Sequence, residues 1–227
     1  MTDLSDDHRI EIKIPLPGHM LSEARFRIHM HPSGLIRTYP ARQVNSIYYD
    51  SYDLKALRLN ESGVSDRVKI RVRWYGNLHQ MKEPVLEIKS KTVLSGQKVR
   101  ISMTTDFDLF SRKWSLLTDD VHRTLPTTML GIKNLASHPV LINSYQRDYF
   151  ATQDGNLRVT LDHDIRSFDQ LLAAKPNLHR PTVAPDIIVI ELKAPVEEEA
   201  FLREATSNLG FRISRNSKYV RGLVSQY

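Results

Sequence analysis

The chain has 227 residues, of which 41% are hydrophobic and 26% are charged, so it has the ordinary composition of a globular protein that can bury a core. It contains no cysteine, which excludes disulfide bonds, thiolate metal sites and a cysteine nucleophile and is compatible with a reducing compartment. The formal net charge of +6 indicates an anionic partner, but it does not choose among nucleic acid, phosphate chains and anionic lipid.

The sequence carries no targeting or membrane-spanning signal. Its first nine residues are polar and acidic and do not resemble a signal peptide, and no apolar run reaches the length of a bilayer span. We therefore expect a soluble, cytoplasmic protein that forms a single domain over residues 1–227.

Strands are predicted where apolar and charged residues alternate with a period of two. In chain order, these segments are residues 9–14, 42–49, 67–74, 84–91, 97–101, 140–150, 157–165 and 186–193. Pro15, Pro17 and Gly18 are expected to end the first strand. In the seventh strand, the alternation predicts that Asp162 and Asp164 share a face.

Helical spacing of apolar residues predicts helices between these strands. They cover residues 20–30, 54–59 and 197–208, with Gly210 as the C-cap of the last one. Asp50 and Ser51 are expected to form a turn and cap that lead into the second helix. Residues 106–135 lose the period of two and predict two further helices that part near Thr118 and Asp119. We expect all of these helices to pack against the sheet.

One predicted strand, residues 67–74, carries an unusual row of like charges. Arg67, Lys69, Arg71 and Arg73 fall on one face, roughly 7 Å apart, and repel one another. On a lone strand this pattern is typical of a solvated sheet face. The alternative is a polyanion that passes along the face.

Three other predicted strands combine an acid and a base on one face. Each contains a Glu-x-Lys pattern, at residues 11–13, 87–89 and 191–193. If the sheet closes into a barrel with helices outside, these charged faces point inward. A basic lumen needs water and counter-charge, and a phosphate chain supplies oxygens that match guanidinium groups, while glutamates can hold a divalent ion against phosphate.

These motifs resemble a known family. Residues 69–76 together with residues 86–89 are similar to the polyphosphate-polymerase (VTC) branch of the triphosphate tunnel metalloenzymes. The similarity continues, in order, over residues 46–50, 145–147, 158–162, 190–193 and 217–219. The resemblance implies an α+β fold: an antiparallel β-barrel of about eight strands that forms a triphosphate tunnel, with helices packed outside.

The resemblance also implies site residues. Catalytic, phosphate-binding roles are carried over to Lys13, Arg71, Arg73, Lys89, Lys98, Arg147, Arg158 and Lys218. Weaker substrate-binding candidates, which rest on face and spacing, are Arg42, Lys69, Arg100, Lys193 and Arg215. Glu191 matches the family's metal-binding glutamate, and Glu11, Glu87 and Asp162 are secondary metal ligands or orient the lysines. The implied cofactor is Mn²⁺ or Mg²⁺.

The activity that the resemblance implies is metal-dependent phosphoryl transfer on tri- or polyphosphate, with polyphosphate synthesis from a nucleoside triphosphate such as ATP as the first expectation. The adenylate-cyclase and thiamine-triphosphatase (CYTH) branch begins with Glu-x-Glu-x-Lys, but Arg9 stands at the first acidic position here, which favours the polymerase branch. The alternatives are hydrolysis of triphosphate or polyphosphate and non-catalytic binding of polyphosphate.

Nucleic acid is the less favoured anionic partner. Trp74 and Tyr75 could stack on single-stranded bases, but Trp74 falls on the aliphatic face and the interleaved glutamates would repel a phosphate backbone. Eukaryotic polymerase relatives carry a membrane segment, so a separate membrane protein that receives the product is a candidate partner. The oligomeric state is left open.

Overall fold

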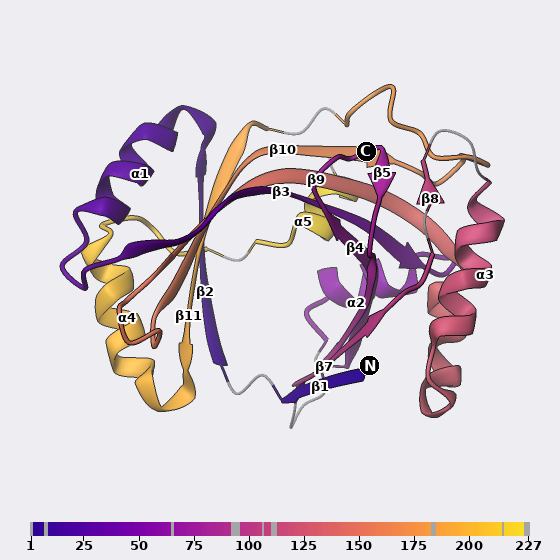
Figure 1. Ribbon diagram of the computed structural model, residues 1–227, viewed down its shortest axis with the longest axis horizontal. Coiled ribbons are helices and arrows are strands. Elements are labelled where there is room, and N and C mark those ends of the chain that lie inside the picture. Colours follow the sequence, from indigo (N-terminus) through magenta and orange to yellow (C-terminus); the bar gives the residue numbers. More distant parts are fainter. Residues whose placement is uncertain are drawn as a thin grey trace.

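The computed structural model describes residues 2–6, 9–64, 66–91, 96–105, 107–109, 113–182, 185–214 and 216–224. A nine-stranded antiparallel sheet, in the order β1-β7-β6-β4-β3-β9-β10-β11-β2, curls around a central space (Figure 1). Its strands are β1 (Thr2–Asp6), β2 (Arg9–Pro17), β3 (Ile36–Asp50), β4 (Arg67–Tyr75), β6 (Val85–Lys91), β7 (Gly96–Ser102), β9 (His138–Ala151), β10 (Arg158–Asp169) and β11 (Ile187–Pro195). A separate small sheet pairs β5 (Gln80–Met81) with β8 (Phe107–Asp108).

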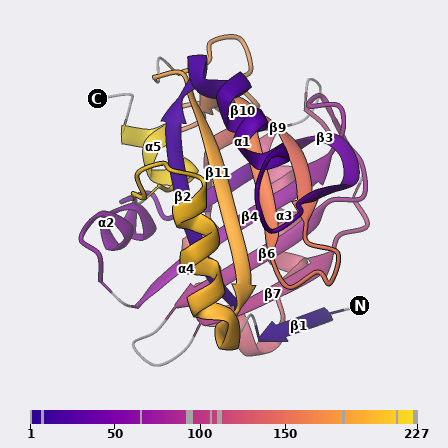
Figure 2. The ribbon, with the colours of Figure 1, turned by 90° about the vertical axis from the view of Figure 1, so that its left-hand side faces the viewer.

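Helices cover the convex face of the curled sheet on two sides (Figures 1 and 2). On one side, η1 (Gly18–Met20) leads into α1 (Leu21–His29), and η3 (Val196–Glu198) leads into α4 (Glu199–Asn208). The apolar faces of α1 and α4 pack on the aliphatic faces of β2, β10 and β11. On the other side, α3 (Trp114–Thr124) and η2 (Thr127–Ala136) cover β3, β4, β6 and β7. In the strands that these helices cover, alternation therefore buries the aliphatic side outward and turns the charged side inward.

Two short helices lie at one end of the concave face. These are α2 (Lys55–Glu61) and α5 (Lys218–Val224), which share a small apolar cluster with Tyr48 of β3 and Leu141 of β9. The Asp50 carboxylate accepts the backbone N–H groups of Ala56 and Leu57 at 2.9 and 3.0 Å, so it caps α2 from several residues upstream, as expected. This cap fixes α2 against the end of β3.

The α+β class and the antiparallel tunnel architecture with helices outside are confirmed. The main sheet has nine strands, where about eight were expected, because β1 adds to the edge formed by β7. Among the described residues no pairing joins β1 to β2, so the sheet is curled and open along that seam. No described helix combines the length and apolar character needed to cross a membrane.

Several predicted boundaries were wrong. β2 continues through Pro15 to Pro17 because it pairs only with β11 in the described sheet, and a proline at a sheet edge removes no ladder bond on its solvent side. α3 is continuous through Thr118 and Asp119, and the break falls after Thr124, where Pro126 follows.

Asp164 does not share the face of Asp162. The register of β10 shifts between His163 and Arg166, and Asp164 adopts a positive φ of 51°. Its exposed carboxylate instead lies 2.9 Å from Nδ1 of His163. A bulge of this kind re-aims a side chain, and simple alternation does not reveal it. Gly210, with φ 67°, ends α4 as expected.

Candidate active site

Cross-strand registry brings the charged positions of many strands to the concave face. In an antiparallel sheet, directly paired residues point to the same side. Arg71 is paired with Tyr48 and with Glu87, and Lys89 is paired with Lys69 and with Lys98. The sequence candidates that registry places on this face are Lys13, Arg42, Lys69, Arg71, Arg73, Lys89, Lys98, Arg100, Arg147, Arg158 and Lys193. Lys218 reaches the same face from α5, and Arg215 lies outside the described residues.

Glu87 is the centre of the first cluster on this face. Its carboxylate, 3% exposed, accepts Nε of Arg71 at 2.7 Å and lies 3.6 Å from Nη1 of Arg73. Nζ of Lys98 and Nε of Arg100 lie 4.0 and 3.3 Å away. Burial alone would raise the pKa of the Glu87 carboxyl, but Arg71, Arg73 and Lys98 outweigh it and hold that pKa below its usual range. Glu87 is therefore ionised, hydrogen-bonded to Arg71 and within ion-pair distance of Arg73, Lys98 and Arg100.

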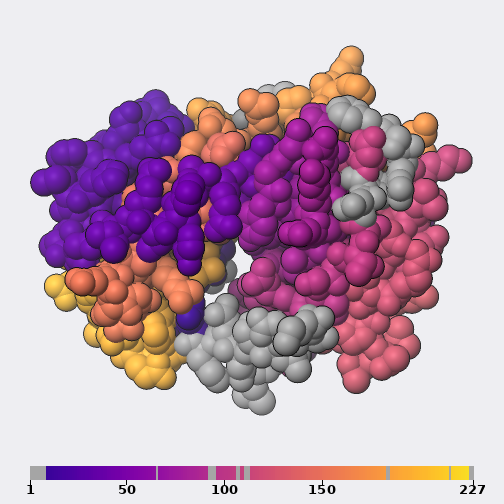
Figure 3. Space-filling model, viewed as in Figure 1, coloured from indigo at the N-terminus to yellow at the C-terminus, as the bar shows by residue number. Residues whose placement is uncertain are grey.

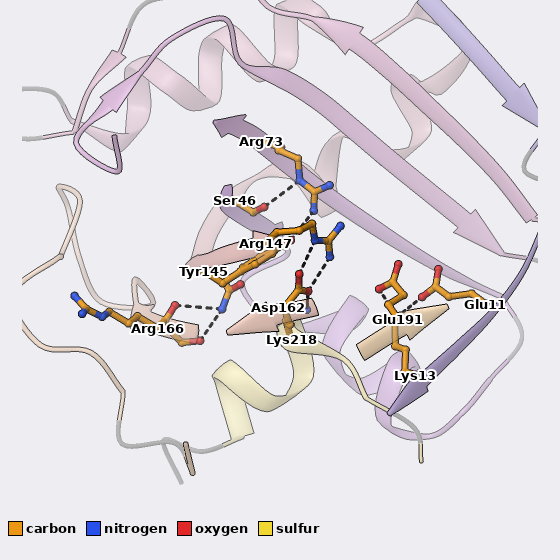
Figure 4. A network of polar contacts seen from close by, with 12 residues as sticks. Glu11, Lys13, Ser46, Arg73, Tyr145, Arg147, Asp162, Arg166, Glu191 and Lys218 are labelled. Carbon is orange, nitrogen blue, oxygen red and sulfur yellow. Dashed lines mark hydrogen bonds and ion pairs between the residues drawn. The ribbon is translucent and has the colours of Figure 1, made fainter. Parts of the chain in front are cut away.

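Asp162 is the centre of a second cluster (Figure 4). Nε and Nη2 of Arg147 both donate hydrogen bonds to this fully buried carboxylate, and the Nη2 to Oδ2 distance is 2.7 Å. The amine of Lys218 donates to Oδ2 as well. Burial would raise the pKa of Asp162, but Arg147 and Lys218 hold it below its usual value. Asp162 thus ties β9, β10 and α5 together and fixes two cations at the concave face.

A third cluster contains two carboxylates and two lysines. Registry pairs Glu191 with Lys13 and Lys193 with Glu11, so acid and base alternate at four adjacent positions of β2 and β11. Nζ of Lys193 lies 2.7 Å from Glu191 and 3.2 Å from Glu11. Lys13 contacts Glu11, and both lie beside Glu191 (Figure 4). Burial would raise the pKa of Glu191, but Lys193, Arg147 and Lys13 hold it well below its usual range. Glu11 is also held ionised, against its burial and the charge of Glu191.

Other cations on this face lack such a partner. Among the described residues, no carboxylate lies within ion-pair distance of Lys69, Lys89 or Arg158. The amine of Lys69 instead donates to the hydroxyl of Ser217 at 3.0 Å. Burial and the neighbouring cations, Lys13 first, lower the pKa of Lys69 to about 8. The concave face thus has unneutralised positive charge that an anion would compensate.

Residues of the first and third clusters border a hollow. A cavity of about 200 Å³ lies between β2 and β11 on one wall and β6 and β7 on the other. It is lined by Arg9, Glu11, Lys89, Lys91, Gly96, Gln97, Lys98 and Lys193. The space-filling view is hollowed at its centre between the indigo and magenta parts of the chain (Figure 3). Cations on the two walls therefore face one another across this space, and Arg9, Lys89 and Lys91 among them are exposed.

The Glu11–Glu191 pair has the donor chemistry for a divalent cation. Mg²⁺ is commonly held by one or two carboxylates and completed by substrate phosphate oxygens and water. Among the described residues no group of three acidic or histidine side chains could enclose a metal on its own. The residues therefore fit an ion that is shared with a phosphate. Glu11 and Glu191 offer two carboxylates on paired strands that contact the same lysine, whereas Glu87 and Asp162 each lie singly among cations.

Sequence reasoning missed the tyrosines that support the arginines. The hydroxyl of Tyr48 accepts Nη1 of Arg71 at 3.2 Å, and that of Tyr145 accepts Nη2 of Arg73 at 3.4 Å. Lys218 lies over the ring of Tyr145, with 4.7 Å from its Nζ to the ring centroid. The available signal was the period of two. Tyr48 lies two residues from Ser46 and Tyr145 lies two residues from Arg147, which places both tyrosines on the charged faces of their strands.

Comparisons with known proteins agree with this architecture. A family model for the VTC domain matches residues 8–227. Similar solved structures include a putative adenylyl cyclase from Hippeastrum, described as having a dominant triphosphatase activity, with 15% identity, a TM-score of 0.54 and coverage of 96% of this chain and 97% of that one. Another is a putative adenylate cyclase from Vibrio parahaemolyticus, with 11% identity, a TM-score of 0.52 and coverage of 97% and 99%. At these identities the likeness shows the fold. No curated protein matches the sequence.

Proposed function

The chain belongs to the VTC domain family, and from this premise we propose that its tunnel catalyses metal-dependent phosphoryl transfer on tri- or polyphosphate, in the direction of polyphosphate synthesis from a nucleoside triphosphate. One observation carries the proposal: arginines fixed by buried carboxylates share a concave face with the Glu11–Glu191 pair. Phosphoryl transfer needs little covalent help from a protein, and depends on positioning and on charge placed in advance.

The arginines bind the phosphate chain in this proposal. Glu87 holds Arg71 and Asp162 holds Arg147, so these guanidinium groups are oriented before substrate arrives and lose little freedom on binding. Lys89 and Arg158 carry charge without a carboxylate partner among the described residues and would pair with phosphate oxygens. The phosphate-binding set is completed by the other residues that match the family's motifs, namely Lys13, Arg73, Lys98 and Lys218.

Glu191 and Glu11 would hold the divalent ion, Mn²⁺ or Mg²⁺, which when bound supplies Lewis-acid charge stabilisation at the transferred phosphoryl group. Both carboxylates are ionised in the folded chain, as metal ligands must be. Lys13 and Lys193 now neutralise these oxygens and lie beside them. With the carboxylates engaged by an ion, the amines of Lys13 and Lys193 would be free to contact the phosphate chain.

Hydrolysis is the second candidate function. It is favoured by the Hippeastrum relative, whose description names a dominant triphosphatase activity. The same cations would hold triphosphate, and water would replace a phosphate chain as the acceptor. The two reactions therefore differ in the acceptor and in the product.

The test is incubation of the purified chain with ATP or inorganic tripolyphosphate in Mn²⁺ or Mg²⁺. Synthesis yields long-chain polyphosphate and nucleoside diphosphate from ATP, whereas hydrolysis releases orthophosphate from tripolyphosphate. If neither product forms with either ion, the proposal is contradicted.

The matched variant is Glu191→Gln, with the exposed Glu204→Gln on α4 as control. We expect Glu191→Gln to abolish metal-dependent turnover, at least about 100-fold, because a ligand to the ion is lost. Binding of tripolyphosphate without metal should persist, since a negative charge is removed from a basic face. Full activity in Glu191→Gln would show that the metal lies elsewhere.

A further inference from the structure

We propose that three tyrosines around Arg42 form a nucleobase subsite, which takes the base of a nucleoside triphosphate while its phosphates lie on the tunnel cations. The tyrosine cluster is defined as Tyr39, Tyr75 and Tyr149. This inference rests on the proposed function, because it names the class of triphosphate that the tunnel accepts.

The cluster encloses the guanidinium of Arg42 on several sides. Its Cζ lies 5.4 Å from the ring centroid of Tyr39, 5.2 Å from that of Tyr75 and 4.9 Å from that of Tyr149. The rings of Tyr39 and Tyr149 also meet edge to face at 5.9 Å. Among the described residues no carboxylate pairs with Arg42, which distinguishes it from Arg71, Arg73 and Arg147.

The cluster opens to solvent. Tyr39 is 57% exposed and Tyr75 is 38% exposed, and Arg42 is exposed as well. A cation–π contact at an exposed position contributes about 0.5–1 kcal/mol, so the fold itself gains little from collecting three rings here. An open arrangement of flat aromatic and guanidinium surfaces is instead the usual means of stacking a base.

The position of the cluster matches the shape of a nucleotide. Registry pairs Arg42 with Arg147, so the cluster lies on the concave face. Tyr149 follows Arg147 by two residues on β9, and Tyr75 follows Arg73 by two residues on β4, which is about 7 Å along each strand. A ribose can therefore extend from phosphates held at Arg73 and Arg147 to a base at the rings.

Phosphate alone does not explain the cluster. Arg147, the cation paired with Arg42, is already held by Asp162, and the ring faces around Arg42 are electron-rich and would repel a phosphate. Because rings recognise the face of a base and not its hydrogen-bonding edge, the subsite should accept adenine and guanine nucleotides similarly. Inorganic tripolyphosphate would leave it empty.

The test compares the affinities of ATP and of inorganic tripolyphosphate, measured by calorimetry in EDTA so that turnover does not interfere. The variant is Tyr39→Leu combined with Tyr75→Leu, and the control is Tyr52→Leu, an 81% exposed tyrosine that stacks on His138 away from the cluster. Since stacking on an aromatic side chain contributes about 1–3 kcal/mol per base, we expect the double variant to weaken ATP binding by about 5- to 150-fold. Its affinity for tripolyphosphate should not change.

Each other outcome is decisive. Equal losses for both ligands would overturn the base subsite and assign the cluster to phosphate binding, and no loss for either would overturn it as well. If tripolyphosphate does not bind the wild-type chain, the proposed function itself fails. A measurement that needs no variant is photolabelling with 8-azido-ATP: label on residue 39, 75 or 149 supports the subsite, and label confined to other residues contradicts it.

Discussion

Lys69 carries its charge on the concave face, where its amine donates a hydrogen bond to the hydroxyl of Ser217. Burial and the charges of Lys13 and Arg67 lower its pKa from 10.5 to about 8. Between these two values the folded chain binds fewer protons than the unfolded chain, so this group makes stability rise as the pH increases from about 8 to about 10.5. Bound phosphate would raise the pKa of Lys69 again, because an anion nearby favours the charged amine.

Phosphate binding near pH 8 should therefore take up protons. We expect calorimetric titration with tripolyphosphate in EDTA, repeated in buffers of different ionisation enthalpy, to show proton uptake. Because Lys69 is about half protonated near pH 8, it can take up at most about half a proton per chain. The matched variant Lys69→Arg keeps the charge but does not titrate, so its uptake should fall while its affinity is retained. Unchanged uptake in Lys69→Arg would show that another group binds the proton; the pKa of Lys98, also lowered by burial, makes it the first alternative.

At the scale of elements, α5 joins the wall of the tunnel through Gly222. A Cβ atom there would lie 2.7 Å from Cδ2 of Leu141 and 2.9 Å from Oγ of Ser167, so the helix packs directly on β9 and β10. This close approach positions Lys218, at the start of the same helix, against Asp162. The helix therefore couples packing at one end to charge at the other.

Replacing Gly222 should weaken both the packing of α5 on the sheet and the contact between Lys218 and Asp162. We expect Gly222→Val to lower the free energy of unfolding by about 1–3 kcal/mol, because the overpacking cost exceeds the few tenths of a kcal/mol that helix propensity returns. Tripolyphosphate affinity should fall too, as Lys218 shifts away from Asp162. The control is Gly131→Val in η2, where nothing lies within 4 Å of the added Cβ. Urea unfolding and calorimetry measure the two effects, and wild-type values for both would show that α5 does not set the position of Lys218.

Elements differ in how far the sequence predicts them. Alternation correctly separated Arg71 from Trp74, because a sheet with one buried face imposes the period of two on every residue. It did not predict that Lys218 meets Asp162, since such contacts join segments distant in the chain. It also missed α5, a helix of seven residues, because so short a helix is stabilised by tertiary packing and leaves little local signal.

Charge is sorted across the whole molecule. Aliphatic residues of β2, β4, β6, β7, β10 and β11 face outward under α1, α4, α3 and η2, and the cations face the interior of the curl. Trp74 illustrates the sorting, because it is fully buried in the outer core and is not available for stacking on a base. The excess positive charge inside is a cost in the free chain, and a linear polyanion that enters the curl removes it.

This arrangement predicts a difference between two polyanions of equal charge. Tripolyphosphate or a longer polyphosphate presents bare phosphates to Arg71, Arg147 and their neighbours. A single-stranded oligonucleotide carries a sugar and a base on every phosphate, so it must fit these bulkier groups into the curl beside Arg71 and Arg147. At a concentration of about 100 times its Kd, polyphosphate should add about 2.7 kcal/mol of stability and raise Tm by about 5–10 °C. The oligonucleotide, at equal charge concentration and ionic strength, should produce a clearly smaller shift in the same thermal scan. An equal or larger shift would mean that the oligonucleotide binds outside the curl, as on a nucleic-acid-binding surface. The tunnel would then not be the binding site.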